Sequence, residues 1–331
     1  MRRLLLAVTA AAGVILLPAA PASAHAGDAS DVSAYRTTIT GISSPLDGLS
    51  VRVVQGGAGL ELTNTSDRTI EVLGYHGEPY LEIRPDGAYE NVNSPATYLN
   101  ADTALPAGAD ATVAPSWRLI SDDPTVRWHD ERARWTEAGL PATTDPAQRT
   151  RLRDWAIPLR DQTRTFEIQG TLDYEPPPPT WAWWTGAALI AALGALLAHR
   201  WSGAVRPLAL IAAFAPWGYA LTRVLDGTGW SGVLMLAGAI AAGAVYRHPP
   251  FYLALSGFVV AAFAGFGSTD VFFAAVVPSA GPGWLARALV AVTIGAGAGL
   301  ALTGVLRLRA ATAPAPASRE GLPEPSTASS A

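Results

Sequence analysis

The chain has 331 residues, of which 50% are hydrophobic, a formal net charge of −4 and no Cys. The lack of Cys excludes disulfides, thiolate metal ligands and a Cys nucleophile. All 23 basic side chains are Arg, and polar residues are concentrated in certain segments, so the chain is predicted to contain more than one unit.

Residues 1–24 have the layout of a secretory signal peptide. Arg2 and Arg3 are followed by the apolar core "LLLAVTAAAGVILL" and by "PAAPASA", whose end has the small-x-small pattern that a signal peptidase cleaves. We predict cleavage after Ala24, which makes His25 the first residue of the mature chain. The alternative is an uncleaved membrane anchor.

Residues 25–174 are predicted to form an exported all-β domain. Runs such as "YRTTITGI", "ATVAPSWRLI" and "RTFEIQGTLDYE" show period-two alternation, and turn residues separate most of them. Seven or more such strands favour an antiparallel, immunoglobulin-like β-sandwich, although the Cys pair of antibody domains is missing. The polar stretch 136–154 has no strand pattern and is expected to be a surface loop or a short helix.

This predicted outer domain is acidic. Residues 25–179 contain 14 Asp and 9 Glu against 13 Arg, a net charge of −10. Such a domain repels nucleic acid and anionic lipid, so nucleic acid is excluded as a partner. The charge favours a cation or a basic protein partner, or it serves solubility alone.

Residues 175–180, "EPPPPT", predict a stiff linker in polyproline II conformation. The region 181–309 is predicted to lie in the lipid bilayer, because five apolar segments each approach the roughly 20 residues that cross it. These segments are 181–198, 205–222, 230–246, 250–266 and 284–306. Residues 271–280 are too few for a span and are either re-entrant, interfacial or the start of a sixth helix. The low-complexity tail 310–331 is predicted to be disordered and cytoplasmic.

Arginine placement predicts the orientation of these segments. With five spans and the mature N-terminus outside, the inner side has Arg200, Arg206, Arg247, Arg307 and Arg309, and the outer side has Arg223 and Arg287. This asymmetry follows the positive-inside rule. We therefore predict a multi-pass protein of the bacterial cell membrane, with an extracytoplasmic N-terminal domain and a cytoplasmic C-terminus.

Few ionisable groups lie in or near the predicted spans. Arg223, Asp226, Asp270 and Arg287 are all near the outer ends, where they are expected to act as interfacial anchors, with Asp270 able to pair with Arg287. The alternative is a transport pathway, which usually shows ionisable groups within the spans.

The stretch "TVRWHDERARW", residues 125–135, is the densest group of reactive side chains. In a strand, His129 and Glu131 share one face with Arg127 and can begin a metal site. The free amine and ring of His25 can hold copper, with His76 or His129 as a second ligand. The candidate ligands for copper or zinc are therefore His25, His76, His129 and Glu131. The alternative is structural: Trp128 and Trp135 are core or corner aromatics, while the acids and arginines pair at the rim.

Four stretches resemble a family. "LGYHGEPYLEI", "ENVNSPATYLN", "RWHDERARW" and "WAIPLRD…FEIQGTLDYEPPP" are similar to an uncharacterised family of bacterial exported membrane proteins. The resemblance implies an outer domain, a proline spacer and a helical membrane part, but no activity. The family pattern resembles Trp-His-Asp-His-Arg followed by His-Trp-Met. Here Glu131, Arg134 and Thr136 stand at the second His, the third His and the Met, which favours the structural interpretation.

Three functions follow from these observations. The first is a non-enzymatic, membrane-anchored cell-envelope protein whose acidic β-sandwich binds a protein partner or stabilises a complex. The second is an exported copper- or zinc-handling protein, and the third is a transporter component. No HExxH, GxSxG or intramembrane Asp pair occurs in the predicted spans, and no organic cofactor is implied.

Overall fold

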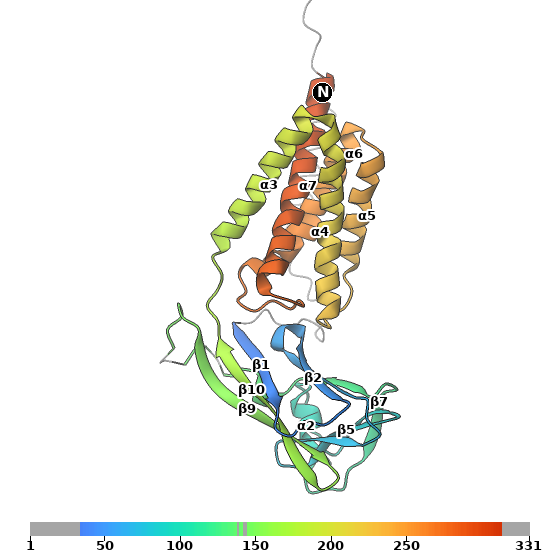
Figure 1. The fold of residues 1–331 in the computed structure, drawn as a ribbon, viewed down its shortest axis with the longest axis vertical. Coiled ribbons are helices and arrows are strands. Elements are labelled where there is room, and N and C mark those ends of the chain that lie inside the picture. Colours follow the sequence, from blue (N-terminus) through green and yellow to red (C-terminus); the bar gives the residue numbers. More distant parts are fainter. Residues whose placement is uncertain (1–33, 138, 142–143, 313–331) are drawn as a thin grey trace, which may run out of the picture.

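The computed structural model describes residues 34–137, 139–141 and 144–312. The predicted signal peptide 1–24, His25 and nearly all of the predicted tail 310–331 lie outside these residues. A β-domain and a helical bundle are stacked end to end along the long axis of the molecule (Figure 1). The predicted class, an all-β domain joined to an α-helical bundle, is therefore confirmed.

Ten antiparallel strands of the described residues form two sheets. The larger sheet has the order β1-β10-β9-β4-β5-β6-β7, and the smaller has the order β2-β3-β8. The strand bounds are β1 Tyr35–Ile42, β2 Leu49–Val54, β3 Gly59–Asn64, β4 Ile70–Leu73, β5 Pro79–Arg84, β6 Gly87–Asn91, β7 Trp117–Ser121, β8 Thr125–Trp128, β9 Thr150–Asp161 and β10 Arg164–Tyr174. Short helical turns lie at η1 Gln55–Gly57, α2 Pro95–Leu99 and η2 Glu131–Ala133.

The core of the β-domain follows from strand periodicity. In β9 the alternate residues Trp155, Ile157 and Leu159 are buried, and Ile168 of the paired strand β10 is also fully buried. These side chains meet Leu62 of the smaller sheet in one hydrophobic cluster. Burial of branched and aromatic side chains from both sheets is the main stabilising contribution here.

Two boundaries differ from the sequence prediction. The run "ATVAPSWRLI" becomes a strand only from Trp117, and the residues before it are exposed. The polar stretch 136–154 contains the first five residues of β9, starting at Thr150. Arg149 and Arg151 both donate to the carboxylate of Asp173 on the neighbouring strand β10, at 2.6 and 2.8 Å. Cross-strand ion pairs therefore hold this polar segment in the sheet where hydrophobic alternation is missing.

The bundle consists of α3 Thr180–Arg200, α4 Val205–Leu225, α5 Gly232–Tyr246, α6 Pro250–Val259 and α7 Gly283–Thr312. A short 3-10 turn, η3 Ser202–Ala204, precedes α4, while the π-helical turn η4 Val260–Gly265 and the 3-10 helix η5 Phe266–Phe272 continue α6. Four of these helical segments are long and apolar enough to cross a membrane, and α5 is a shorter apolar helix. The chain from Phe273 to Pro282 contains no helix, so the 271–280 segment does not form a sixth helical span.

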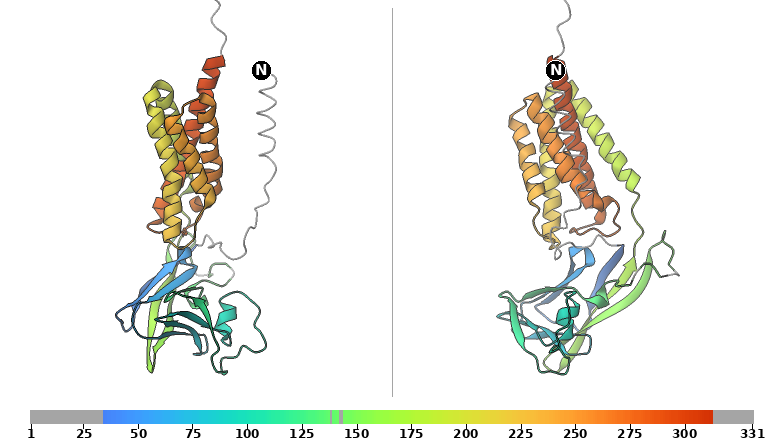
Figure 2. Two further views of the ribbon diagram at one scale, coloured as in Figure 1. Left: turned by 90° about the vertical axis from the view of Figure 1, so that its right-hand side faces the viewer. Right: turned by 180° about the vertical axis from the view of Figure 1, so that it is seen from behind.

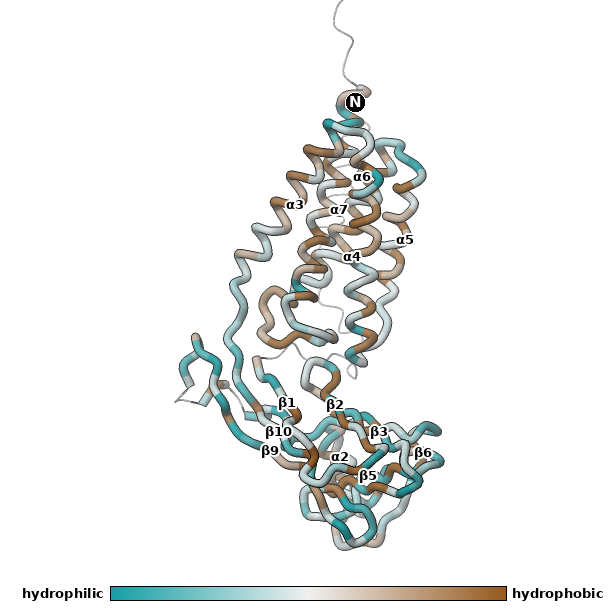
Figure 3. The backbone as a smooth tube through the Cα atoms, in the orientation of Figure 1, coloured by the Kyte–Doolittle hydropathy of each residue, from teal (hydrophilic) through white to brown (hydrophobic). Residues whose placement is uncertain are grey.

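Successive helices run in alternating directions, so each end of the bundle has its own charge pattern (Figures 1 and 2). The ends of α3 and α7 and the starts of α4 and α6 lie away from the β-domain, and the five predicted inner Arg lie there. Arg223 and Arg287 lie in the turns nearest the β-domain. Figure 3 shows apolar residues along all the bundle helices, while the loops of the β-domain are largely hydrophilic.

Close helix packing in the bundle depends on small residues. A Cβ atom on Gly257 of α6 would lie 2.3 Å from the backbone nitrogen of Ala301 on α7, and one on Gly304 would lie 2.3 Å from that of Ala254. The backbones of α6 and α7 are therefore in direct contact, as is common where helices associate in lipid. In contrast, α3 contacts mainly α7 and leans away from α4 toward the β-domain (Figure 1).

Candidate functional site

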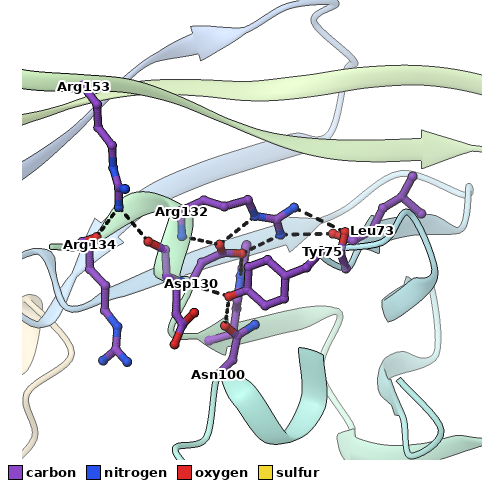
Figure 4. A network of polar contacts seen from close by, with 10 residues as sticks. Leu73, Tyr75, Asn100, Asp130, Arg132, Arg134 and Arg153 are labelled. Atoms are coloured by element: carbon purple, nitrogen blue, oxygen red, sulfur yellow. Dashed lines mark hydrogen bonds and ion pairs between the residues drawn. The ribbon is translucent and has the colours of Figure 1, made fainter. Parts of the chain in front are cut away.

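The stretch 125–135 forms a buried polar corner. Strand β8 ends at Trp128, and Asp130 caps the following 3-10 turn by accepting a hydrogen bond from the backbone nitrogen of Arg132 at 3.1 Å. The Asp130 side chain is fully buried. Its two oxygens also accept from Nε and Nη2 of Arg132, both at 2.8 Å, and from Nε1 of Trp128 at 3.1 Å (Figure 4).

Arg132 extends this corner to the neighbouring strands. Its Nη2 donates to the carbonyl of Leu73 at 3.1 Å, and its guanidinium lies 4.8 Å from the centre of the Tyr75 ring. The Tyr75 hydroxyl donates to Asn100 and accepts from the backbone nitrogen of Glu131 at 3.0 Å (Figure 4). Burial, together with the charge of Asp130, raises the pKa of Tyr75, so the phenol stays a neutral donor.

The expectation that all the charged groups of this stretch pair at the rim is therefore wrong for Asp130. Its carboxylate is inside the domain, where an ion pair gains little net stability but is costly to break. The aromatic part of the same expectation holds: Trp128 is buried, and Trp135 stacks on Tyr35 with ring centres 5.6 Å apart. The corner ties β8 to the β4–β5 turn and to the end of α2.

Of the predicted metal ligands, His76 lies in the β4–β5 turn, and His129 and Glu131 follow strand β8. His129 is half-buried, and its Nε2 lies 3.1 Å from Oε1 of Gln55. Burial and the nearby charge of Arg134 lower the pKa of His129, so its ring is neutral at pH 7. His76 is exposed in the β4–β5 turn, where its backbone nitrogen donates to Glu78 at 2.9 Å.

Within residues 34–137, 139–141 and 144–312, no group of three or more His, Asp or Glu side chains is placed to hold a metal ion. His76, His129 and Glu131 are therefore not assembled into a three-ligand cluster. Strand β8 ends before His129, so the shared strand face expected for His129 and Glu131 does not form. His25 lies outside the described part of the chain, and its predicted role in copper binding stays a prediction.

A second polar region joins the β-domain to the bundle. The turn between β2 and β3 reaches the end of α4, where the backbone nitrogen of Gln55 donates to the carbonyl of Asp226 at 2.9 Å. The backbone nitrogen of Gly56 donates to Oδ2 of the same residue at 2.8 Å. Gly56 has φ of 64°, and a Cβ there would lie 2.9 Å from Cα of Pro278. Only glycine fits this turn between the two parts of the molecule.

Charged side chains reinforce the junction. Glu61 of β3 accepts from Nε of Arg52 and of Arg127, and Arg52 also donates to the carbonyl of Leu225 at 2.9 Å. Burial alone raises the pKa of Glu61, but the two arginines outweigh it and leave the pKa lowered. For Asp226 burial dominates over its hydrogen bonds, and its pKa is raised.

The expected Asp270–Arg287 pair is not present. The Nε of Arg287 donates to the carbonyl of Val271 at 3.0 Å, and its Nη2 donates to those of Ala274 and Ala275 at 2.6 and 2.9 Å. Arg287 is only 8% exposed and forms no ion pair with any described carboxylate. This arginine therefore holds the irregular segment after η5 against the start of α7.

A third region is the exposed edge of the larger sheet. Strand β7 pairs with β6 on one side and is the last strand of the sheet. Leu119 and Ile120 are 48% and 42% exposed, and the preceding loop exposes Leu105 and Val113 as well. Exposed Asp86, Asp122 and Asp123 lie around the end of this strand, since a Cβ on Gly87 would contact Ser121 and Asp122.

Comparisons with protein-family models, curated proteins and solved structures found no match. The three regions described above are therefore the basis for the proposed function. Sequence reasoning missed two of them, the junction at Asp226 and the edge at β7. The pair Gly56-Gly57 after an apolar strand is a turn signal that pointed to a sharp turn, but nothing in the sequence indicated what it contacts.

Proposed function

We propose that the chain is a membrane-anchored, non-enzymatic cell-envelope protein whose β-domain binds a protein partner. The observation that supports this most is the open edge at β7, where the apolar side chains of Leu119 and Ile120 are exposed. An exposed edge strand presents unpaired backbone N–H and C=O groups to another chain, and soluble domains usually protect such edges. Strand β7 is short and contains a bulge, but its apolar side chains Leu119 and Ile120 stay exposed, which suits an edge that is covered in a complex.

The partner segment is an extended, basic strand. An added strand forms main-chain hydrogen bonds with β7, while its side chains contact the exposed Leu119 and Ile120. The exposed acids Asp86, Asp122 and Asp123 at the strand end favour Lys or Arg on the partner. The negative charge of the outer domain as a whole, −10 over residues 25–179, acts in the same direction.

Site-specific photo-crosslinking in intact cells tests this proposal. A photoreactive residue at Leu119 or Ile120 is expected to give one discrete adduct with another protein, and the same residue at the exposed control Thr165 of β10 is not. Ile120→Lys is expected to reduce the adduct at Leu119, while Thr165→Lys leaves it unchanged. Equal labelling from all three positions, or an adduct with twice the mass of the chain alone, contradicts a distinct partner at β7.

The proposed orientation places the β-domain outside the cytoplasm. Because the chain has no Cys, a single introduced thiol reports its own exposure. A membrane-impermeant maleimide is expected to label Thr165→Cys in spheroplasts, but Ser202→Cys, at the opposite end of the bundle, only after permeabilisation. The reverse labelling pattern would refute the extracytoplasmic placement.

A further inference from the structure

A cavity of about 140 Å³ lies at the junction of the two parts of the molecule. Arg36 of β1 and Gly56 line it from the β-domain, and Asp226, Ser279 and Gly283 line it from the bundle. The lining residues come from four separate segments of both parts of the molecule, so the cavity exists only where the β-domain docks on the helices. One water molecule needs about 15 Å³ of such space, so the cavity has room for a ligand of several non-hydrogen atoms.

The cavity presents a positive and a negative side chain. Arg36 uses Nε and Nη2 to bind Glu175, the latter at 2.9 Å, which leaves Nη1 without a hydrogen bond among the described residues. The hydrogen bonds of Asp226 from Gly56 and Thr228 both use Oδ2, and its Oδ1 has none within the described chain. Each group therefore has capacity for one more partner.

Ser279 provides independent evidence for a ligand. It is 7% exposed, it lines the cavity, and its buried hydroxyl has no hydrogen-bond partner in the described structure. A buried hydroxyl without a partner is costly, so native proteins normally satisfy it. The helix α7 begins at Gly283 on the same wall, and the free N–H groups of a helix start favour an anion.

The lining also distinguishes between kinds of cation. No aromatic side chain is among the described residues that line this cavity. Quaternary ammonium groups are usually held by aromatic rings, whereas a primary ammonium is held by hydrogen-bond acceptors such as a carboxylate and a hydroxyl. Asp226 and Ser279 are acceptors of this kind, so the cavity suits a primary ammonium.

We propose that this cavity binds a small zwitterion of the aminoalkyl phosphate type, as in a phosphoethanolamine group. The phosphate lies between Nη1 of Arg36 and the start of α7, and the ammonium lies between Oδ1 of Asp226 and the hydroxyl of Ser279. Phosphate is favoured over a carboxylate because the cavity lies at the ends of helices apolar enough to span a membrane, where lipid phosphates are found. The source is either a lipid headgroup or a free soluble compound.

Calorimetric titration of the full chain in a maltoside detergent tests the chemistry. O-phosphoethanolamine is expected to bind with a Kd of about 1 mM or tighter, and inorganic phosphate, ethanolamine and phosphocholine each at least about tenfold more weakly. The amino acid β-alanine serves as the carboxylate analogue. Tighter binding of β-alanine or of phosphocholine than of O-phosphoethanolamine would overturn the proposal.

Variants locate the binding. Ser279→Ala removes only the unpartnered hydroxyl and is expected to weaken binding about tenfold with no loss of thermal stability. Asp226→Asn is expected to lower the preference for O-phosphoethanolamine over inorganic phosphate. Ser268→Ala and Asp270→Asn, which lie at the same end of the bundle but do not line the cavity, are the matched controls. Binding that is unchanged in Ser279→Ala and in Asp226→Asn would also refute the site.

The source of the ligand is decided by native mass spectrometry from nanodiscs. Retention of phosphatidylethanolamine but not phosphatidylcholine by the wild type, and its loss in Ser279→Ala, identifies a lipid headgroup. Binding of soluble O-phosphoethanolamine without retained lipid identifies a free compound. If neither is bound, the proposal fails.

Discussion

The β-domain and the bundle differ in what fills their interiors. The largest fully buried side chains of the β-domain are Leu and Ile, such as Leu62, Ile83 and Ile157, together with buried Trp128 and Trp155. In the bundle, Ala is the commonest buried residue, and glycines allow backbones to touch. Large apolar side chains such as Leu189, Phe214 and Leu236 are instead exposed on its outside.

The two regions also differ in charge. The ion pairs of the described residues all lie between Arg36 and Glu175. Buried Arg287 of the bundle is bound by backbone carbonyls instead. These differences indicate that the β-domain folds in water and that the bundle is surrounded by lipid. Water drives large apolar side chains inward, whereas lipid does not distinguish inside from outside, so helices there associate through close contact of small residues.

The largest effect expected of the β-domain is at its buried ion pair. Asp130→Asn leaves the guanidinium of Arg132 without a counter-charge inside the domain, which typically costs about 3–5 kcal/mol. Chemical unfolding followed by Trp fluorescence measures the change. Asp154→Asn is the control, because that carboxylate is 78% exposed and pairs with Arg151 at the surface. Similar losses for the two variants would show that the corner is no more important than a surface pair.

The bundle is expected to respond most to added volume. Gly257→Ala forces α6 and α7 apart and should cost about 1–3 kcal/mol, as overpacking does. At Gly186 of α3 no atom lies within 4 Å of the added Cβ, so Gly186→Ala should be neutral or stabilise by up to about 1 kcal/mol through helix propensity. Thermal unfolding in detergent, followed by circular dichroism, measures both. Equal effects at the two positions would contradict direct backbone contact between α6 and α7.

A smaller effect is expected at the docking turn. Gly56→Ala places a methyl group against Pro278 and disfavours φ of 64°. We expect faster hydrogen–deuterium exchange of the backbone amides of residues 55 and 56, which donate to Asp226, with little change in the melting temperature of either part of the molecule. Gly77→Ala is the control, since it also has positive φ but no atom within 4 Å of its Cβ. Unchanged exchange of these amides in Gly56→Ala would contradict the docking role of this turn.

The smallest effect concerns pH. Because the pKa of His129 is lowered in the folded domain, the unfolded chain binds the proton first as the pH falls below about 6.5. The stability of the domain should therefore decrease from pH 7 to pH 5, and His129→Gln should weaken this dependence. His76→Gln, at an exposed position, should not. Melting temperatures at the two pH values measure the difference, and a wild-type domain that is more stable at pH 5 would show the opposite sign.

The architecture could be predicted from the sequence because two local signals are clear, the alternation of residues in strands and the length of the apolar segments. Alternation in stretches such as 164–174 predicted strands, and apolar length predicted the helices, since each signal depends on residues near one another in the chain. The limits of β7 and β9 were not predicted, because cross-strand partners such as Asp173 determine them. The burial of Asp130 was missed although its partners Trp128 and Arg132 are close to it in the sequence, because the groups that enclose this pair, Leu73, Tyr75 and Asn100, belong to other elements and meet it only after folding.

The prolines after Glu175 form an extended connection from β10 to α3, and Glu175 is held by Arg36 where that connection starts. With the contact of Gly56 on Asp226, the β-domain has two attachments to the helical bundle instead of one. Two attachments prevent the rotation of the β-domain that a single flexible linker would allow. If a partner binds at β7 as proposed, it is therefore held in one fixed orientation relative to the helices.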